Sequence, residues 1–309
     1  MSDPRQRYEQ LIQNLRSDLR PQREWGEGRG IFMVIGHIVV GVAAGAWLFA
    51  LLYASRAGLT LAWVLGALGG MAHLVNLAHP QRFWRMVAQY RSSWISRGFV
   101  GLSLFLAGAL LYLVPQYLPD GPWGNQSLLA GTGYVLALLG MLILMGYMGF
   151  VYSASKAIPF WNSPLHPALY LAYALRGGVA ALLLVHALGG SSSAGFNDLL
   201  LWWLGITAVV MLFFTLEVHG AWTGGNAAAR RSVRELFAGR VAVYFYGGTL
   251  ALGLAVPAWL AWAGLSGAQS LQAMAILGLA SACGDFFMKY STIRAGVYLP
   301  VWTRVAPQR

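Results

Sequence analysis

The sequence predicts an all-α integral membrane protein, with eight transmembrane helices in one bundle and both chain termini in the cytoplasm. The composition, the spacing of the apolar stretches and the distribution of the cations predict this fold class. Of the 309 residues, 58% are hydrophobic and only 10% are charged, whereas soluble domains carry about 25% charged residues. A soluble fold of this length needs more polar surface than this chain supplies, so the composition favours a multi-pass membrane protein.

The first thirty residues form a separate cytoplasmic segment in this interpretation. They are dense in charge and contain no early apolar core, so they do not resemble a secretory signal peptide. Their apolar residues share one helical stripe, which predicts an amphipathic helix on the membrane or on a partner. These residues are Tyr8, Leu11, Ile12, Leu15 and Leu19, and Pro21 follows them. A weakly ordered tail is the alternative.

Eight apolar stretches follow, each close to the twenty residues that a helix needs to cross about 30 Å of hydrocarbon. Backbone groups in lipid must pair within their own segment, so the stretches are predicted to be helices. They cover residues 31–53, 58–78, 98–118, 127–152, 167–188, 199–222, 241–264 and 270–288. The domain assignment is therefore a segment over 1–30, a membrane domain over 31–288 and a cytoplasmic tail over 289–309. Glycine-rich stretches at 41–46 and 66–70 predict close helix–helix contact.

The cations set the predicted orientation. Of 21 Lys and Arg residues, 19 fall on the side of the membrane that carries the N-terminus, Arg56 falls on the other side, and Arg176 lies inside a span. An excess of this size predicts that the N-terminal side is cytoplasmic. The net charge of +11 is then expected to meet lipid headgroups or a protein partner rather than nucleic acid. Loops on the opposite side are too short for an extracytoplasmic domain.

Polar and ionisable side chains in the spans or at their ends gather in the predicted cytoplasmic half, where we expect them to face the bundle interior. This set comprises His37, His73, Asn76, His79, Glu217, His219 and Asp285, while Arg176 sits near mid-depth and His186 and Asp198 lie at the opposite end. His73, Asn76 and His79 are spaced i, i+3 and i+6, roughly on one face, beside Arg82. Polar donors in this arrangement favour a quinone site with a route for protons.

Several of these residues have simpler interpretations. His166 and His186 are expected to be capping or interfacial groups, and Arg176 is expected to pair with a carbonyl or with Glu217. His37 and His73 could also share a haem iron, because both lie in the cytoplasmic half. Cys283 is expected to be a small buried apolar residue; a single cysteine makes no internal disulfide and holds no cysteine-ligated iron–sulfur cluster. We find no phosphate-loop, haem-attachment, zinc-protease or nucleophile-elbow motif, hence no self-contained catalytic set.

Three stretches carry a resemblance to a known family. LAHPQRFW (77–84), followed by SSWISRG (92–98), resembles the exit of the second span and the following loop of the NrfD/DmsC superfamily. VYSASKAIPFWNSPLHP (151–167) and DFFMKYSTIRAGVYLP (285–300) are similar to the family's fourth-span exit and C-terminal ending. Members are integral-membrane anchor subunits of complex iron–sulfur molybdoenzymes.

The resemblance implies a quinone-binding anchor that contains no haem and no catalytic centre of its own. Such an anchor exchanges electrons between ubiquinone or menaquinone and a four-cluster ferredoxin-like subunit, which serves a molybdopterin subunit. The cytoplasmic position of all three motifs favours relatives that oxidise a cytoplasmic substrate such as sulfite or phenylacetyl-CoA over exported dimethyl sulfoxide reductase.

The pattern of polar residues and the resemblance together give the following expected roles. His73, Asn76, His79, Arg82 and His37 would bind the quinone, and Glu217, His219, Asp285 and Arg176 would carry protons. Partner docking would use Trp84, Arg85, Tyr90, Arg91, Trp94, Arg97 and Trp161.

Two positions depart from the family pattern. Asn76 stands where the family's quinol-linked histidine is expected, so His73 or His79 would have to replace it. Gly98 stands where some DmsC-type members carry a glutamate, so either the acid would come from Glu217 or Asp285, or the proton route would differ. Three other classes remain open at this point: a haem b-binding anchor, a secondary transporter and a structural membrane protein. Polar groups gathered at one membrane face rather than at the midplane argue against a transporter.

Overall fold

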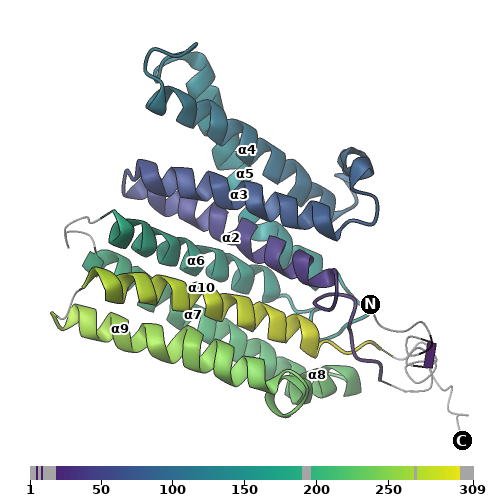
Figure 1. Cartoon of the computed structure of the whole chain (residues 1–309). Coiled ribbons are helices and arrows are strands. Elements are labelled where there is room, and N and C mark those ends of the chain that lie inside the picture. Colours follow the sequence, from purple (N-terminus) through teal and green to yellow (C-terminus); the bar gives the residue numbers. More distant parts are fainter. Residues whose placement is uncertain (1–4, 6–7, 10–18, 190–195, 268–269, 300–309) are drawn as a thin grey trace, which may run out of the picture.

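The chain folds into a helical bundle whose long helices run side by side (Figure 1). The computed structural model describes residues 5, 8–9, 19–189, 196–267 and 270–299. Eight of its helices are long and apolar enough to cross a membrane. Across the described residues the only extended pairing is an isolated bridge between Pro21 and Val297. The all-helical class and the number of spans agree with the sequence prediction.

The helix bounds lie within a few residues of the predicted spans, except at the last one. The elements are α2 (Gly30–Leu52), α3 (Arg56–Asn76), η1 (Pro80–Gln89), α4 (Trp94–Tyr117), α5 (Leu128–Ser153), α6 (His166–Leu188), α7 (Phe196–Thr223), α8 (Ala227–Ala238), η2 (Tyr244–Ala255), α9 (Val256–Leu265) and α10 (Leu271–Ala295). The seventh span is continuous through η2, which has π-helical geometry, and α9. Two short surface helices, η1 and α8, were not predicted.

The prediction that α10 ends at residue 288 is wrong, because the helix continues to Ala295. Lys289, predicted to be part of a cytoplasmic tail, is therefore inside the bundle with 4% of its surface exposed. Its ammonium nitrogen lies 4.9 Å from the ring centroid of Tyr170 and 5.7 Å from that of Tyr173. The positive charge of Lys289 made the last turns of α10 look too polar for a membrane span. In the structure, contact with the two tyrosine rings stabilises this charge inside the bundle. Cys283, predicted to be buried, is exposed on the outer face of α10.

Glycine seams hold the central helices together. A Cβ atom at Gly45 of α2 would lie 1.9 Å from the carbonyl oxygen of Ala174 in α6, and one at Gly178 would lie 2.2 Å from the Gly45 carbonyl carbon. The two helices therefore cross in direct backbone contact, which only residues without side chains permit. Gly69 of α3 packs closely against Val40 of α2, where a Cβ atom would lie 2.6 Å from Cγ2 of Val40 and 3.0 Å from its backbone nitrogen. The close contact predicted from the glycine-rich stretches is confirmed at these positions.

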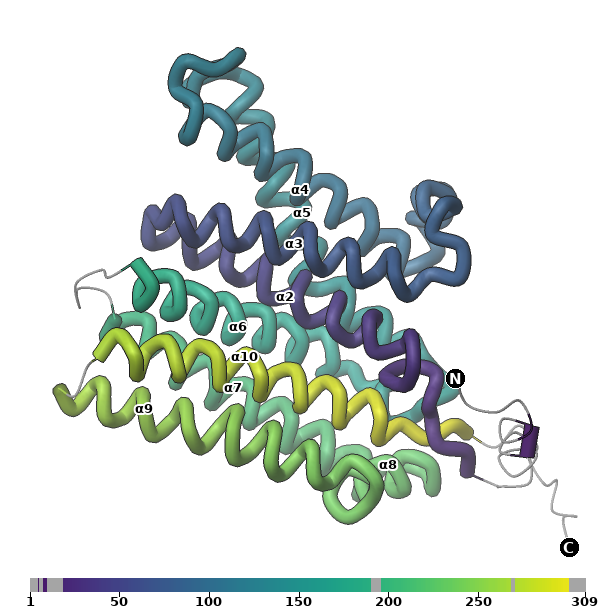
Figure 2. The backbone as a smooth tube through the Cα atoms, in the orientation of Figure 1, coloured from purple at the N-terminus to yellow at the C-terminus, as the bar shows by residue number. Residues whose placement is uncertain are grey.

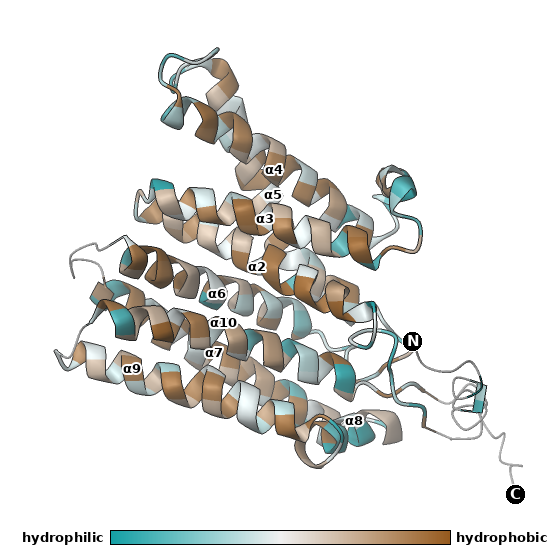
Figure 3. Ribbon diagram, in the orientation of Figure 1, coloured by the Kyte–Doolittle hydropathy of each residue, from teal (hydrophilic) through white to brown (hydrophobic). Residues whose placement is uncertain are grey.

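The helices divide into two groups joined through α2, α5 and α6. Helices α2 to α5 pack on one another on one side, and α6, α7, η2–α9 and α10 do so on the other. The α4–α5 hairpin leans away from the rest toward its loop end (Figure 2). Apolar residues cover the helices, and hydrophilic residues gather at the end that carries η1, α8 and the N-terminal segment (Figure 3). This is the end with the cation excess.

An N-terminal strap, residues 19–29, crosses that hydrophilic end and pairs with the end of the chain. The backbone N–H of Gln22 donates to the carbonyl of Gly296 at 2.8 Å, and Glu27 forms an ion pair with Arg294 at 2.5 Å. Trp25 inserts from the strap against Tyr152, with ring centroids 5.4 Å apart. Of the predicted amphipathic stripe, Tyr8 and Leu19 are described and Tyr8 is exposed; Leu11, Ile12 and Leu15 lie outside the described residues.

Candidate functional site

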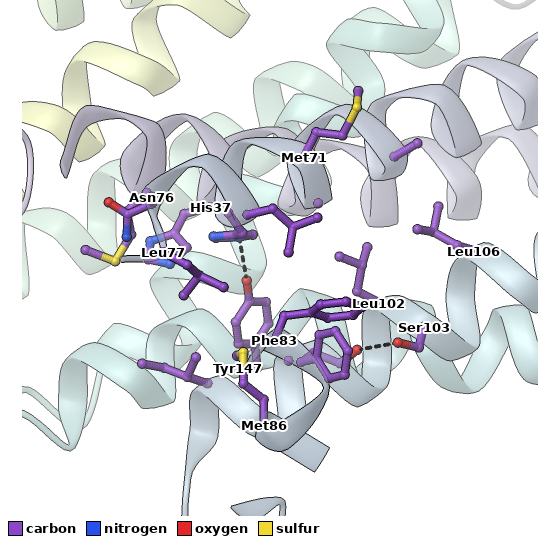
Figure 4. A pocket seen from close by; sticks show the side chains of 18 residues that line it. His37, Met71, Asn76, Leu77, Phe83, Met86, Leu102, Ser103, Leu106 and Tyr147 are labelled. Atoms are coloured by element: carbon purple, nitrogen blue, oxygen red, sulfur yellow. Dashed lines mark hydrogen bonds between the residues drawn. The ribbon is translucent and has the colours of Figure 1, made fainter. Parts of the chain in front are cut away.

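A cavity of about 430 Å³ opens between α2, α3, α4, α5 and η1, at the hydrophilic end of the bundle (Figure 4). Its volume lies in the usual range for small-molecule sites, about 300–1,000 Å³. The residues that line it are Met33, His37, Ala67, Gly70, Met71, His73, Leu74, Asn76, Leu77, Phe83, Met86, Ile95, Gly98, Phe99, Leu102, Ser103, Leu106 and Tyr147. We refer to it as the α3–α4 pocket.

Polar groups of the α3–α4 pocket gather near the ends of α3 and α5. The Tyr147 hydroxyl lies 3.4 Å from Nε2 of His73 (Figure 4). Behind it, the ring centroids of His73 and His37 are 4.9 Å apart, and Nδ1 of His37 lies 3.0 Å from the Tyr152 hydroxyl. Asn76 completes this end of the lining. The pocket thus offers hydrogen-bond partners for a carbonyl or hydroxyl group, with two imidazoles that can exchange a proton.

The rest of the pocket is apolar and elongated along the helices. Gly70 and Ala67 lie about one and two turns deeper along α3 than His73, while Leu102 and Leu106 line the facing side of α4. From Asn76 to Ala67 the wall extends about 13 Å along α3, given 1.5 Å per residue. A polar end near the surface and an apolar slot toward the membrane interior suit an amphipathic ligand with a long hydrocarbon tail.

His79 and Arg82 lie outside the pocket lining, contrary to the expected single face of His73, Asn76 and His79. Helix α3 ends at Asn76, and Leu77 is already extended. His79 precedes Pro80, which disfavours helical geometry at the residue before it. His79 is therefore a non-helical residue at the start of η1, and both His79 and Arg82 are exposed.

The geometry does not fit a haem held by His37 and His73. The two ligands of one haem lie on opposite faces of its macrocycle, but these rings are tilted at 52° with centroids 4.9 Å apart. No porphyrin fits between them in this arrangement. Among the described residues, no group of three or more His, Cys, Asp or Glu side chains could hold a metal ion.

The residues predicted to dock a partner separate into three groups. Trp84, Arg85, Tyr90 and Arg91 are exposed on η1 and the turn that follows it. Trp94 and Arg97 are half-buried on α4, where the Arg97 guanidinium lies 4.1 Å from the Trp94 ring centroid. Trp161 is 2% exposed and packs against Trp25 and Tyr152. Its predicted place on a docking surface does not agree with this burial, because the strap covers it.

Three of the four residues predicted to carry protons lie in two buried pairs. Arg176 pairs with Asp285, with Nε at 3.0 Å from Oδ1, and not with a carbonyl or Glu217. Glu217 instead accepts from His166, whose Nδ1 is 2.7 Å from Oε1. His166 is therefore an interior residue and not the interfacial group that was expected. His219 is exposed on the far side of α7, so it does not join these pairs.

Sequence reasoning missed Tyr147, Tyr152 and Tyr170. In an apolar span, a tyrosine whose hydroxyl takes part in a site cannot be distinguished by sequence from a tyrosine that only packs in the core. Tyr152 and Tyr170 have ring centroids 5.2 Å apart, and Tyr170 stacks on His166 at 5.2 Å. A row of contacts therefore leads from His37 in the pocket wall through Tyr152, Tyr170 and His166 to Glu217.

Comparison with known proteins places the chain in a family. Residues 29–300 match the family model described as "Polysulphide reductase, NrfD". The chain belongs to the NrfD family. The matched range includes all eight spans, the residues of the α3–α4 pocket and both buried pairs.

Named relatives of this NrfD-family protein are distant but span most of it. It is 27% identical to a polysulfide reductase chain of Wolinella succinogenes over 217 residues, which cover 65% of this protein and 68% of the relative. It is 27% identical to protein NrfD of Escherichia coli over 255 residues, covering 74% and 78%. It is 25% identical to a sulfite dehydrogenase subunit of Allochromatium vinosum over 184 residues, covering 57% and 53%.

Proposed function

We propose that this chain is the quinone-reactive membrane anchor of an oxidoreductase complex in a bacterial inner membrane. It would pass electrons between the quinone pool and an iron–sulfur subunit that serves a molybdopterin subunit. The single observation that carries the proposal is the α3–α4 pocket, whose polar end and apolar slot match a quinone head and its isoprenoid tail. Family membership and the names of two relatives, one from a polysulfide reductase and one from a sulfite dehydrogenase, support the place in a complex.

The pocket residues fit a quinone by their chemistry. The Tyr147 hydroxyl, His73 and Asn76 would bind the oxygens of the head group, with His37 behind His73 as a proton acceptor or donor. Met71, Phe83 and Met86 would enclose the head and exclude water, because thioether and aromatic side chains adapt to a planar apolar ring. A bound quinone supplies two-electron, two-proton redox chemistry.

The partner subunits would dock at the cation-rich end, which we assign to the cytoplasm with both termini. Exposed Trp84, Arg85, Tyr90 and Arg91 lie on or beside η1, whose other face carries Phe83 and Met86 of the pocket. Arg and aromatic residues are the types that anchor protein interfaces. A docked iron–sulfur subunit would therefore lie directly over the polar end of the pocket. The substrate of such a complex would be cytoplasmic, with sulfite the first candidate.

We also propose that protons reach the pocket through the interior of the bundle. His37, Tyr152, Tyr170 and His166 lead to Glu217 through the contacts described above. Tyr170 Oη and His166 Nε2 are buried and have no hydrogen-bond partner among the described residues. Orphaned polar atoms of this kind are the ones that bridging water satisfies. This route uses Glu217 but replaces His219 with His166.

The test is photolabelling of the complex with a tritiated azido-quinone, after purification of the tagged full-length chain from its native membrane. Labelled peptides should come from α3, η1 and α4, and iron–sulfur and molybdopterin subunits should co-purify without a haem absorption band.

Leu106→Trp fills the apolar slot and should lower labelling about tenfold or more, which corresponds to 1.4 kcal/mol of binding. Leu110→Trp is the matched control, because Leu110 lies one turn further on α4 and is exposed on the outer face. Equal labelling of both variants, or a haem band, contradicts the proposal.

A further inference from the structure

A second hollow, of about 260 Å³, lies on the outer face of α4 and α5. It is lined by Tyr90, Trp94, Arg97, Val100, Leu142, Ile143, Gly146, Tyr147 and Phe150. We refer to it as the α4–α5 groove. Leu142 is 62% exposed on the wall of this groove although it belongs to an apolar span. The groove therefore opens sideways, to the hydrocarbon of the bilayer, and not to the aqueous end of the bundle.

The groove has a polar rim and an apolar floor. Leu142 is eleven residues from the end of α5 at Ser153, so the floor reaches about 16 Å into the membrane. The rim is made by Arg97, in the first turn of α4, and by Tyr90 in the preceding turn. Trp94 stacks on Phe150 with ring centroids 4.2 Å apart, and the two rings line the groove between its polar rim and its apolar floor. A phospholipid has the same order of polar head and apolar chain along its length.

The guanidinium of Arg97 is held in place at the rim. It lies 4.1 Å from the Trp94 ring centroid, and it donates through Nε to the carbonyl of Tyr90 at 3.1 Å and through Nη2 to that of Arg91 at 2.8 Å. Arg91 in turn donates to the Tyr90 hydroxyl at 3.0 Å. Fixing a long side chain in this way reduces the entropy lost when it binds an anion.

No carboxylate neutralises these two cations. Residues 79–98 contain four arginines and no Asp or Glu, and neither Arg91 nor Arg97 forms an ion pair within the described part of the chain. These cations are therefore available to an anion from outside the chain. An acidic protein segment cannot follow the groove into the hydrocarbon, because its backbone would lack hydrogen-bond partners there. A lipid headgroup carries its negative charge at the right depth.

We propose that the α4–α5 groove binds one anionic phospholipid, with its phosphate at Arg97 and one acyl chain along Val100, Leu142, Ile143 and Gly146. Gly146 leaves the space for the acyl tail: a Cβ atom there would meet only Phe150, at 3.7 Å. Tyr147 forms a wall of both the groove and the α3–α4 pocket. The bound lipid would therefore support the Tyr147 ring from its outer side.

Native mass spectrometry of the full chain, released from nanodiscs of equal parts dioleoylphosphatidylglycerol and dioleoylphosphatidylcholine, tests the proposal. The wild type should retain one phosphatidylglycerol in preference to phosphatidylcholine. Gly146→Leu fills the groove without a backbone clash and should lower retention of both lipids at least fivefold. Arg97→Gln should remove the preference for phosphatidylglycerol. An unfolding curve of each variant in detergent verifies that the bundle is intact.

Each variant has a matched control. Gly131→Leu adds the same side chain to the same helix, at an exposed site with no neighbour within 4 Å. Arg56→Gln removes a cation that also lies over an aromatic ring, Tyr117, at the opposite end of the bundle. Both controls should retain phosphatidylglycerol as the wild type does. Wild-type retention by Gly146→Leu, or an unchanged lipid preference in Arg97→Gln, overturns the proposal, whether or not the α3–α4 pocket binds a quinone.

Discussion

At Gly98 the absence of a side chain makes room for the ring of Tyr147. A Cβ atom there would lie 2.2 Å from Cδ2 of Tyr147. Some DmsC-type members carry a glutamate at this position, and the structure gives a physical reason for the departure: the ring of Tyr147 occupies the space that a longer side chain needs. The Tyr147 hydroxyl, on the neighbouring helix, is a polar group of the α3–α4 pocket beside this position.

Gly98→Ala should therefore weaken quinone binding by displacing that ring. Overpacking of this kind costs about 1–3 kcal/mol, and a displaced Tyr147 hydroxyl loses its position beside His73. We expect about tenfold lower azido-quinone labelling of the complex. Gly131→Ala, at a site without neighbours, should label like the wild type. Wild-type labelling of Gly98→Ala would mean that the head group does not depend on Tyr147.

Residues of the site differ in how far the sequence could predict them. His37, His73 and Asn76 were predicted because polar groups are rare in apolar spans, and the structure places all three on the pocket wall. Tyr147 could not be predicted, since its hydroxyl matters only through the neighbouring helix. His79 was included because the prediction extended α3 past Asn76, where the approach to Pro80 ends the helix.

Among the elements, length and hydropathy predicted the eight spans, but not η1, α8 or the strap. These short segments are too polar for the span pattern, and tertiary contacts hold them in place. On α8 the carboxylate of Glu235 is buried and accepts from Nε of Arg240 at 3.0 Å, while Arg231 lies 2.8 Å away. The same Arg240 donates to the carbonyl of Arg294. Glu235 thus joins α8 to the end of α10.

Stability should depend on pH through Glu235. Burial alone would raise the pKa of Glu235, but the hydrogen bonds from Arg240 and the charges of Arg240 and Arg231 lower it below its usual value of 4.5. The ionised carboxylate therefore stabilises the fold above pH 4.5, and this contribution is lost as the pH falls through the lowered pKa. Glu235→Gln should lose about 1 kcal/mol at pH 7.

Thermal unfolding in detergent between pH 3.5 and 7 checks this prediction. The difference in midpoint between wild type and Glu235→Gln should shrink as the pH falls below 4.5. Asp120→Asn, which changes an exposed carboxylate at the other end of the bundle, should show no such pH-dependent difference. A constant difference between wild type and Glu235→Gln would mean that shape rather than charge accounts for the effect of Glu235.

At the scale of the whole molecule, the two helix groups hold different parts of the polar interior. Helices α2 to α5 enclose the pocket, whereas α6, α7 and α10 supply Glu217, Lys289 and the Arg176–Asp285 pair. The glycine seam between α2 and α6 brings the two groups into contact. The sequence predicted that ionisable groups would gather in one half of the membrane. It could not predict their pairing, because Arg176 and Asp285 are 109 positions apart.

If protons travel between these groups, Glu217→Gln should slow proton exchange at the pocket. The amide keeps the shape of Glu217 and can bond His166, but it cannot hold a proton in transit, so we expect quinone-coupled proton uptake to fall about tenfold or more. The measurement is the pH change outside proteoliposomes that contain the complex, during a single turnover. His219→Gln is the control, since His219 lies two residues away and is exposed. Equal rates in both variants would mean that protons enter the pocket directly beside η1, without the interior route.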